Sequence, residues 1–244
     1  LGDTTRFAYD AVGNRVSVTD ARGNATSFSY DANNRLTKST YADGTTTALT
    51  YDPVGNRTSV VDHLGNTTRY LYDAVDRLVE VVDPLGNRTT YQYDTEGNLL
   101  SLIDAAGNAT RYEYDLLNRL TKTSNATGVA TEYQYDPVGN RIARTDGQGA
   151  TTRYTYDGLN RLTTISYPDG STVEFTYDGL SRLATMKDSL GVTRYEYDAL
   201  SRLITMDGPA ANDTIRYAYD PVGNRLLLTD PDGNVIRATY DEMN

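Results

Sequence analysis

The feature that most constrains the fold of this chain is a Tyr-Asp pair that returns at an almost constant spacing. Nine of the eleven intervals between successive pairs are 21 residues long, and the other two are 20 and 22 residues. The pairs begin at Tyr9, Tyr30, Tyr51, Tyr72, Tyr93, Tyr114, Tyr135, Tyr156, Tyr177, Tyr197, Tyr219 and Tyr240. Periods of about 20 to 50 residues are typical of arrays whose units bury their apolar side only against their neighbours. We therefore expect a single array of about twelve repeats over residues 1–244.

Each unit has the pattern of a β-hairpin. Residues 110–114 (Thr-Arg-Tyr-Glu-Tyr) alternate in type with a period of two, which is typical of a strand with two different faces. A turn opened by the Asp of the Tyr-Asp pair follows, then a second short strand and a turn of the form Asp-x-x-Gly-Asn. Asp opens such turns by accepting N–H bonds, and Gly or Asn tolerates positive φ at their end. The predicted fold class is all-β, with tandem hairpins forming a continuous antiparallel ribbon of about 24 strands. We expect Asp73, Asp94, Asp115, Asp136 and Asp157 to open turns.

The aromatic residues indicate how the ribbon packs. Of 24 Tyr and Phe residues, 12 belong to Tyr-Asp pairs and ten lie two residues before such a pair. Residues i and i+2 share one face of a strand, and equivalent strands recur about 9.6 Å apart at the usual ~4.8 Å strand spacing. We expect two rows of rings that pack together along one face, with polar residues on the other. This structural ladder includes Tyr70, Tyr72, Tyr91, Tyr93, Tyr112, Tyr114, Tyr133, Tyr135, Tyr154 and Tyr156.

A longer pattern overlies the 21-residue repeat. The turn after Tyr-Asp alternates between a Gly-Asn form, as at Gly97, and a form with Arg at the fifth position, as at Arg119. The alternation breaks once, at Arg182. An extra residue beside Gly suggests a β-bulge, so we expect added twist or bend at every second hairpin. Because 42 residues make four strands, a propeller of about six blades is an alternative fold. The sequence Tyr-Asp-Pro-Val-Gly-Asn-Arg also recurs unchanged from residues 51, 135 and 219.

Charge and composition exclude several classes of partner. The net charge of −10 disfavours nucleic acid, whose binding rests mainly on Lys and Arg neutralising phosphates. Arg outnumbers Lys by 20 to 3, a bias suited to stacking on aromatic rings and pairing with carboxylates. The chain has no cysteine, and no apolar run approaches the roughly 18 residues of a membrane span. We expect no membrane span.

The residues also disfavour catalysis and cofactor binding. The chain has one histidine, His63, in a turn where other units have Pro84, Ala105 or Arg22, so we expect a surface turn residue. The acidic residues recur in every unit, whereas glycoside hydrolysis needs a singular pair. Neither turn has the spacing of a calcium loop, and turn capping explains the Asp residues. We expect no enzymatic activity, cofactor or metal.

Two observations keep glycans open as ligands or modifications. Rows of Tyr rings beside Asp and Arg resemble surfaces that stack sugars, although a periodic ladder favours packing within the ribbon. Seven Asn-x-Thr sequons also lie mostly in turns and could accept glycans; they are Asn24, Asn56, Asn66, Asn87, Asn108, Asn125 and Asn212.

The repeat Tyr-Asp-x-x-Gly/Asn-Arg-Leu, followed by Asp-x-x-Gly-Asn-x-Thr-x-Tyr-x-Tyr-Asp, resembles that of the RHS/YD-repeat family over essentially the whole chain. The resemblance implies a β-ribbon wound spirally into a hollow shell, as in bacterial polymorphic toxins, Tc toxin complexes, wall-associated proteins and teneurins. In the toxins the shell encloses a C-terminal toxic domain behind a self-cleaving aspartyl protease core. No such core is visible here, so neither cleavage nor toxicity is carried over. Both ends look like cuts in a longer array, since residues 1–7 match residues 64–70.

The sequence thus predicts a non-enzymatic structural scaffold, part of a hollow shell or tube. The first hypothesis is a wall segment of an RHS-type shell that encloses a C-terminal effector or toxin. The alternatives are an extracellular or cell-surface fibre built from the same ribbon, and an adhesion module that binds glycans with its Tyr face. The expected partners are further repeats of the same chain or neighbouring subunits, and the expected location is secreted, extracellular or at the cell surface.

Overall fold

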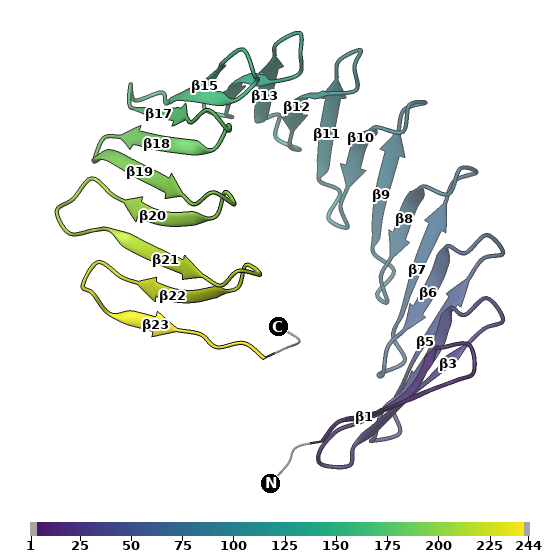
Figure 1. Cartoon of the computed structure of the whole chain (residues 1–244). Helices are drawn as coiled ribbons and strands as arrows, with labels where there is room; N and C mark the ends of the chain where they lie inside the picture. The colour runs from purple at the N-terminus through teal and green to yellow at the C-terminus, as the bar shows by residue number, and fades with distance from the viewer. Residues whose placement is uncertain (1–3, 242–244) are drawn as a thin grey trace. The chain divides into compact units, whose positions relative to one another are not determined.

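The computed structural model describes residues 4–241, and every regular element within them is a β-strand (Figure 1). The chain divides into two compact units, Leu1–Gly128 and Val129–Asn244. The first unit holds β1 (Arg6–Tyr9), β2 (Arg15–Thr19), β3 (Ala25–Tyr30), β4 (Leu36–Thr40), β5 (Thr46–Tyr51), β6 (Arg57–Val61), β7 (Thr67–Tyr72), β8 (Leu78–Val82), β9 (Arg88–Tyr93), β10 (Leu99–Ile103), β11 (Ala109–Tyr114) and β12 (Leu120–Ser124). The second holds β13 (Ala130–Tyr135), β14 (Arg141–Thr145), β15 (Thr151–Tyr156), β16 (Leu162–Ser166), β17 (Thr172–Tyr177), β18 (Leu183–Asp188), β19 (Gly191–Tyr197), β20 (Leu203–Asp207), β21 (Ile215–Tyr219), β22 (Arg225–Thr229) and β23 (Val235–Arg237).

Within each unit, every strand pairs antiparallel with the next strand along the chain. The pairing runs from β1 to β12 in the first unit. It runs from β13 to β23 in the second. The predicted tandem hairpins are confirmed. The propeller alternative is wrong. Separate four-stranded blades would have no hydrogen-bonded pairing between β4 and β5 or between β8 and β9, yet both pairs are antiparallel neighbours.

A one-residue bulge interrupts the ladder in each hairpin closed by a Tyr-Asp turn. In a hairpin of the Arg form, Glu113 faces Lys122 but Tyr114 faces Leu120, so Thr121 is the extra residue. The same shift occurs in a Gly-Asn hairpin, between β9 and β10. The expectation of a bulge at every second hairpin is therefore wrong. The five-residue turn between β10 and β11 closes without a register shift, so the bulge belongs to the Tyr-Asp hairpins of both forms and follows from neither Gly nor loop length alone.

The two faces of the strands differ in exposure, but neither covers a thick core. On β11, Tyr112 and Tyr114 are partly buried, whereas Arg111 and Glu113 are exposed. Among residues 4–241, Ala143 is the one buried hydrophobic residue, and no large side chain is fully buried. A single sheet of this kind depends on contacts between adjacent hairpins, because no second layer covers either face within a unit.

The two irregular repeat lengths arise at two successive connections on the edge opposite the Tyr-Asp turns. β18 and β19 are joined by a tight turn in which Asp188 faces Gly191, so only two residues lie between the paired positions. Both strands are one residue longer than their equivalents, and the interval is 20 residues. The following connection, residues 208–214 between β20 and β21, is longer than the other turns of its kind and gives the interval of 22 residues.

Candidate functional site

In each compact unit, the residues that recur in every repeat lie in the turns at one edge, which we call the Tyr-Asp edge. It consists of the turns at residues 10–14, 31–35, 52–56, 73–77, 94–98, 115–119, 136–140, 157–161, 178–182, 198–202 and 220–224. In the turn after Tyr114, the Asn118 N–H donates to the Asp115 carbonyl at 3.0 Å, and Asn118 has a φ of 59°. The Asp115 carboxylate accepts the N–H groups of Leu117 at 2.9 Å and Arg119 at 3.1 Å. The side chain of Asp115 therefore holds the turn closed.

The Gly-Asn and Arg forms fold the same loop and differ in the group that pairs with the Asp. In the Arg form, Arg119 Nη2 lies 2.7 Å from Asp115 Oδ2. In the Gly-Asn form, Asn98 Nδ2 donates to Asp94 Oδ2 at 2.8 Å. The fourth loop residue has positive φ in both forms, and Gly97 adopts 95° where the Arg form uses Asn, Asp or Ser near 60°. The larger φ favours Gly, whereas Asn, Asp and Ser tolerate the ordinary left-handed region.

Turns of the Gly-Asn form are tied to the next turn by a side-chain amide. Asn98 Nδ2, already bonded to Asp94, also donates to Asn118 Oδ1 at 2.9 Å. Such a bond recurs, at 2.8 to 3.0 Å, between Asn14 and Asn34, Asn56 and Asp76, and Asn140 and Asn160. The residue with positive φ therefore both closes its own turn and accepts a bond from the turn before it.

Turns of the Arg form reach the next turn differently. Arg77 Nη1 donates to the carbonyl of Asp94 at 2.8 Å, in a turn whose Gly97 offers no side-chain acceptor. Bonds of this kind join Arg35 to Asp52, Arg182 to Asp198 and Arg202 to Asp220. Where one Arg turn follows another, the acceptor includes a small hydroxyl. Arg161 Nη1 donates to Ser181 Oγ at 3.0 Å, and Arg182 Nη1 to Ser201 Oγ at 3.2 Å.

These bonds give a physical account of the 42-residue alternation and of its break. In the turn pairs described above, an Asn donor is followed by Asn or Asp at the left-handed position, whereas an Arg donor is followed by Gly or Ser. The Asn side chain is short, so it can bond to the next turn only through a side-chain oxygen of that turn. The Arg side chain is long enough to reach a backbone carbonyl of the next turn. At Arg182 the alternation breaks, and Ser takes the place of Asn at the left-handed position.

In ten of the Tyr-Asp pairs, the Tyr hydroxyl donates to a backbone carbonyl of an earlier strand. Tyr114 Oη donates to the carbonyl of Leu99 at 3.1 Å, and Leu99 lies at the register shift between β9 and β10. Equivalent bonds of 2.8 to 3.2 Å are made by Tyr30, Tyr51, Tyr72, Tyr93, Tyr156, Tyr177, Tyr197, Tyr219 and Tyr240. A Phe could not make this bond, which explains why these ten positions are Tyr. Three Phe residues stand instead at the ladder position two residues earlier.

Arg residues lie against the aromatic rows. The Arg77 guanidinium lies 4.8 Å from the centre of the Tyr93 ring in the next Tyr-Asp pair. In a Gly-Asn turn the Arg comes one residue later, and Arg57 lies 4.7 Å from the Tyr70 ring, two residues before the pair. The position of Arg in the turn thus decides which of the two rows of rings it stacks on. Sequence reasoning identified the excess of Arg but not this relationship.

The electrostatics of the edge follow from these bonds. The Arg119 side chain, bonded to the carboxylate, is the main cause that lowers the pKa of Asp115, and backbone N–H groups add to it. Burial raises the pKa of Tyr114 above its usual value, with smaller contributions from Tyr112 and Asp94. The carboxylates are therefore ionised, and the phenols protonated, over a broad range around neutral pH.

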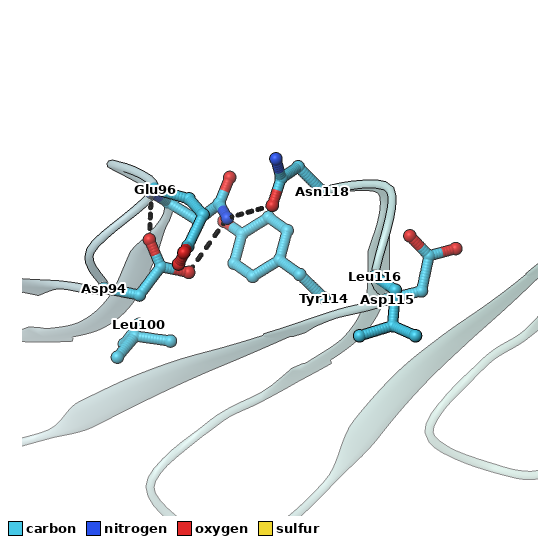
Figure 2. Close-up of a pocket in the computed structure, with 8 residues that line it drawn as sticks. Asp94, Glu96, Leu100, Tyr114, Asp115, Leu116 and Asn118 are labelled. Carbon is cyan, nitrogen blue, oxygen red and sulfur yellow. Dashed lines mark hydrogen bonds between the residues drawn. The ribbon is translucent and has the colours of Figure 1, made fainter.

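The Tyr-Asp edge is hollowed between the turns after Tyr93 and Tyr114 (Figure 2). This cleft has a volume of about 340 Å³ and is lined by Asp94, Glu96, Asn98, Leu100, Tyr114, Asp115, Leu116 and Asn118. The side-chain amide of Asn98 donates to Asp94 Oδ2 and to Asn118 Oδ1. The Tyr114 hydroxyl donates to the backbone carbonyl of Leu99. The lining contains no His, Cys, Ser, Thr or Lys, so it holds no Ser–His or Cys–His pair.

The other residues considered for chemistry lie in exposed turns or strands. His63 is exposed between β6 and β7. Within residues 4–241, no group of three or more His, Cys, Asp or Glu residues is placed to hold a metal ion. No helix in that range is long and apolar enough to cross a membrane. The ladder residues occupy equivalent positions on β7, β9, β11, β13 and β15.

The sequons fall into two groups by the environment of Nδ2, the atom to which an N-linked glycan is attached. Asn56 Nδ2 donates to Asp52 and to Asp76. Asn24, Asn66, Asn87 and Asn108 each donate from Nδ2 to the Asp that opens their own turn. Asn125 and Asn212 are exposed in connections between strands. Glycosylation leaves Nδ2 one hydrogen, so a glycan at Asn56 would remove one of the two bonds that its amide donates.

Comparison with known proteins identifies two matching families. The teneurin YD-shell family model matches residues 56–194, and the RHS repeat model matches residues 1–25, 9–46 and 177–213. No curated protein sequence gives a significant match. The solved structure of TcdB2-TccC3-Cdc42 is similar, with 15% identity and a TM-score of 0.37 over 92% of this chain. A Photorhabdus luminescens Tc holotoxin pore gives 16% identity and a TM-score of 0.37 over 92% of this chain. The alignments span 20% and 19% of those two longer chains.

Proposed function

The chain belongs to the RHS and teneurin YD-shell repeat family, and from this premise we propose that it forms part of the wall of an RHS-type shell enclosing a C-terminal effector. The chain is a structural repeat scaffold. The observation that carries the proposal is that the recurring side chains bond to the adjacent hairpin or turn. Tyr114 bonds to Leu99, Arg77 to Asp94 and Asn98 to Asn118. A wall needs such links between its own units, whereas a binding or catalytic site needs groups directed at a ligand.

We further propose that the two compact units are parts of one array. Both consist of the same hairpin, the same bulge and the same turn bonds, and the Tyr-Asp repeat continues in phase from one unit to the other. In this proposal the chain has no catalytic activity of its own. Turnover that persists through purification and is abolished by one Asp substitution would contradict it.

Two alternatives remain as competing proposals. A secreted or cell-surface fibre is favoured by the uniformity of the links, since the same bonds could continue through any number of hairpins. A glycan-binding Tyr face is less well supported. Arg57 and Arg77 already lie against the faces of Tyr70 and Tyr93, where a sugar ring would have to stack.

Electron microscopy of the intact protein that contains this chain would distinguish the shell from the fibre. A shell predicts closed hollow particles, with a C-terminal segment that resists protease until the particle is opened by denaturant. A fibre predicts open filaments of variable length and a protease-sensitive C-terminal segment. Filaments without any closed particle would contradict the proposed function.

A further inference from the structure

The tips of the Tyr-Asp turns in the second unit form a row of exposed aliphatic side chains. Five successive turns place a Val or Leu at their third position, with 67 to 77% of each residue exposed. These residues, which we call the aliphatic ridge, are Val138, Leu159, Leu180, Leu200 and Val222. At two strand spacings per hairpin, they recur about every 9.6 Å. A continuous row of this kind is a candidate interaction surface rather than scattered surface apolarity.

In the three central turns of the ridge, the Asp carboxylate is paired with an Arg despite the acidic character of the chain. Asp157, Asp178 and Asp198 each lie 2.6 to 2.7 Å from the Arg of their own turn. The second position of the five turns holds only Pro, Gly or Ala, so no long polar side chain stands beside the aliphatic residues. The opposite edge differs, because its tips in this unit include Gln148, Asp169 and Asp232. Leu190 is an isolated exposed leucine on that opposite edge, so in this unit the row of five aliphatic tips occurs on the Tyr-Asp edge.

The order of residues along the ridge matches what a symmetric dimer requires. The tip dipeptides read Pro-Val, Gly-Leu, Gly-Leu, Ala-Leu and Pro-Val, which is nearly the same order from either end. In a two-fold interface, if residue i of one copy contacts residue j of the other, then residue j of the first copy contacts residue i of the other. An antiparallel pair of ridges places Val138 opposite Val222, Leu159 opposite Leu200, and Leu180 opposite itself. The Gly and Ala neighbours leave space for the Leu side chains of the other copy.

We propose that the aliphatic ridge is a self-association surface whose occupant is the same ridge of a second copy of this chain, arranged antiparallel with Leu180 at the two-fold axis. This inference concerns contacts between chains and does not depend on whether the ribbon encloses an effector. A partner with a different period could fill at most one or two of the five positions, whereas a second copy has the required period by construction.

The surface area buried between the two ridges determines the expected affinity of the dimer. An aliphatic side chain buries about 60–120 Å², so five from each of two copies bury at most about 600–1,200 Å². Stable interfaces usually bury about 1,200–2,000 Å². We therefore expect a reversible dimer with a Kd between roughly 1 μM and 1 mM.

Cysteine cross-linking tests the arrangement directly, because the chain contains no cysteine. We expect Leu180→Cys to form a disulfide dimer at least tenfold faster than Leu190→Cys, a matched exposed leucine in a turn of the opposite edge. We also expect a mixture of Val138→Cys and Val222→Cys to form mixed dimers in excess over either homodimer. Equal rates for Leu180→Cys and Leu190→Cys would overturn the proposal. Preferential self-cross-linking of Val138→Cys would overturn the antiparallel arrangement.

Sedimentation velocity of the unmodified chain provides a measurement that needs no variant. We expect the sedimentation coefficient to rise with concentration between about 1 μM and 1 mM. The double variant Leu159→Ser with Leu200→Ser should stay monomeric while keeping its β-type circular dichroism spectrum, because both side chains are exposed. A monomeric unmodified chain throughout the range, or an unchanged dimer in the double variant, would overturn the proposal.

Discussion

Tyr114 donates its hydroxyl hydrogen to the carbonyl of Leu99, 3.1 Å away on the neighbouring strand and beside the bulge of the preceding hairpin. The bond joins a position that is Tyr in every repeat to a backbone group displaced from the regular ladder. This bond links consecutive hairpins in a sheet whose repeats bury few side chains. The recurrence of this bond from hairpin to hairpin makes it the first feature to test.

Tyr114→Phe should destabilise the hairpins on either side by about 1–2 kcal/mol, because it leaves a partly buried carbonyl without its donor. Hydrogen exchange should show the loss of protection confined to β9 to β12, since arrays couple mainly to nearest neighbours. Tyr112→Phe is the matched control, because other repeats carry Phe at this position. Equal effects of the two substitutions would show that the hydroxyl bond contributes nothing specific.

Tyr114→Ala should cost more than the loss of the hydroxyl, because it also removes a partly buried ring; truncating a fully buried aromatic costs about 3–5 kcal/mol. Glu113→Ala, on the exposed face of the same strand, is the control and should cost little. Stability is measured by hydrogen exchange, and binding by retention on a glycan array. Unchanged exchange in Tyr114→Ala together with lost glycan retention would replace the scaffold interpretation of this face by the binding one.

The bond between adjacent turns should be sensitive to the length of the acceptor. Asn118→Ser keeps a residue type that occupies the same left-handed position at Ser181, but its hydroxyl is too short to meet Asn98. We expect a loss of about 0.5–1.5 kcal/mol in urea unfolding. Asn118→Asp should restore most of it, because Asp76 accepts the equivalent bond from Asn56. If the Ser and Asp variants have the same stability, the bond between turns is not stabilising.

The ribbon should unfold in acid. Bonds from Arg119 lower the pKa of Asp115, and bonds from Asn24 lower that of Asp20. A carboxyl whose pKa is lower in the folded state contributes stability above its unfolded pKa, near 4, and that stability is lost as pH falls through the folded value. Urea midpoints should therefore be constant between about pH 5 and about pH 9 and decline below about pH 4. Asp115→Asn should reduce this decline; a pH-independent midpoint would contradict the assignment.

The ribbon should also lose stability at high pH. Burial raises the pKa of Tyr93, Tyr114 and Tyr156, and a phenolate cannot donate to the carbonyl beside the bulge. A group whose pKa is higher in the folded state contributes stability below its unfolded pKa, near 10, and that stability is lost as pH rises through the folded value. Absorbance of the phenolate and circular dichroism should change together above about pH 10. Complete Tyr ionisation without loss of structure would contradict this prediction.

The repeat, the hairpins and the two faces could be predicted because they depend on residues close together in the chain. Alternation in residues 110–114 specifies a strand with two faces, and Asp followed by a residue that tolerates positive φ specifies a turn. The antiparallel order of hairpins follows, since turns this short can only join neighbouring strands. The Tyr-Asp repeat, the alternation within strands and the turn motifs together determined the fold class and the position of the Tyr-Asp turns.

The links that connect one hairpin to the next were decided by the tertiary structure. The alternation between Gly97 and Arg119 was visible in the sequence, but its cause requires two turns to lie side by side, so that Asn98 reaches Asn118. The bulge was expected only beside Gly and occurs in both forms, whereas turns of the same length at the opposite edge have none. That shift selects the carbonyl that Tyr114 reaches. Local patterns determine which elements form, whereas the register between strands determines which side chains meet.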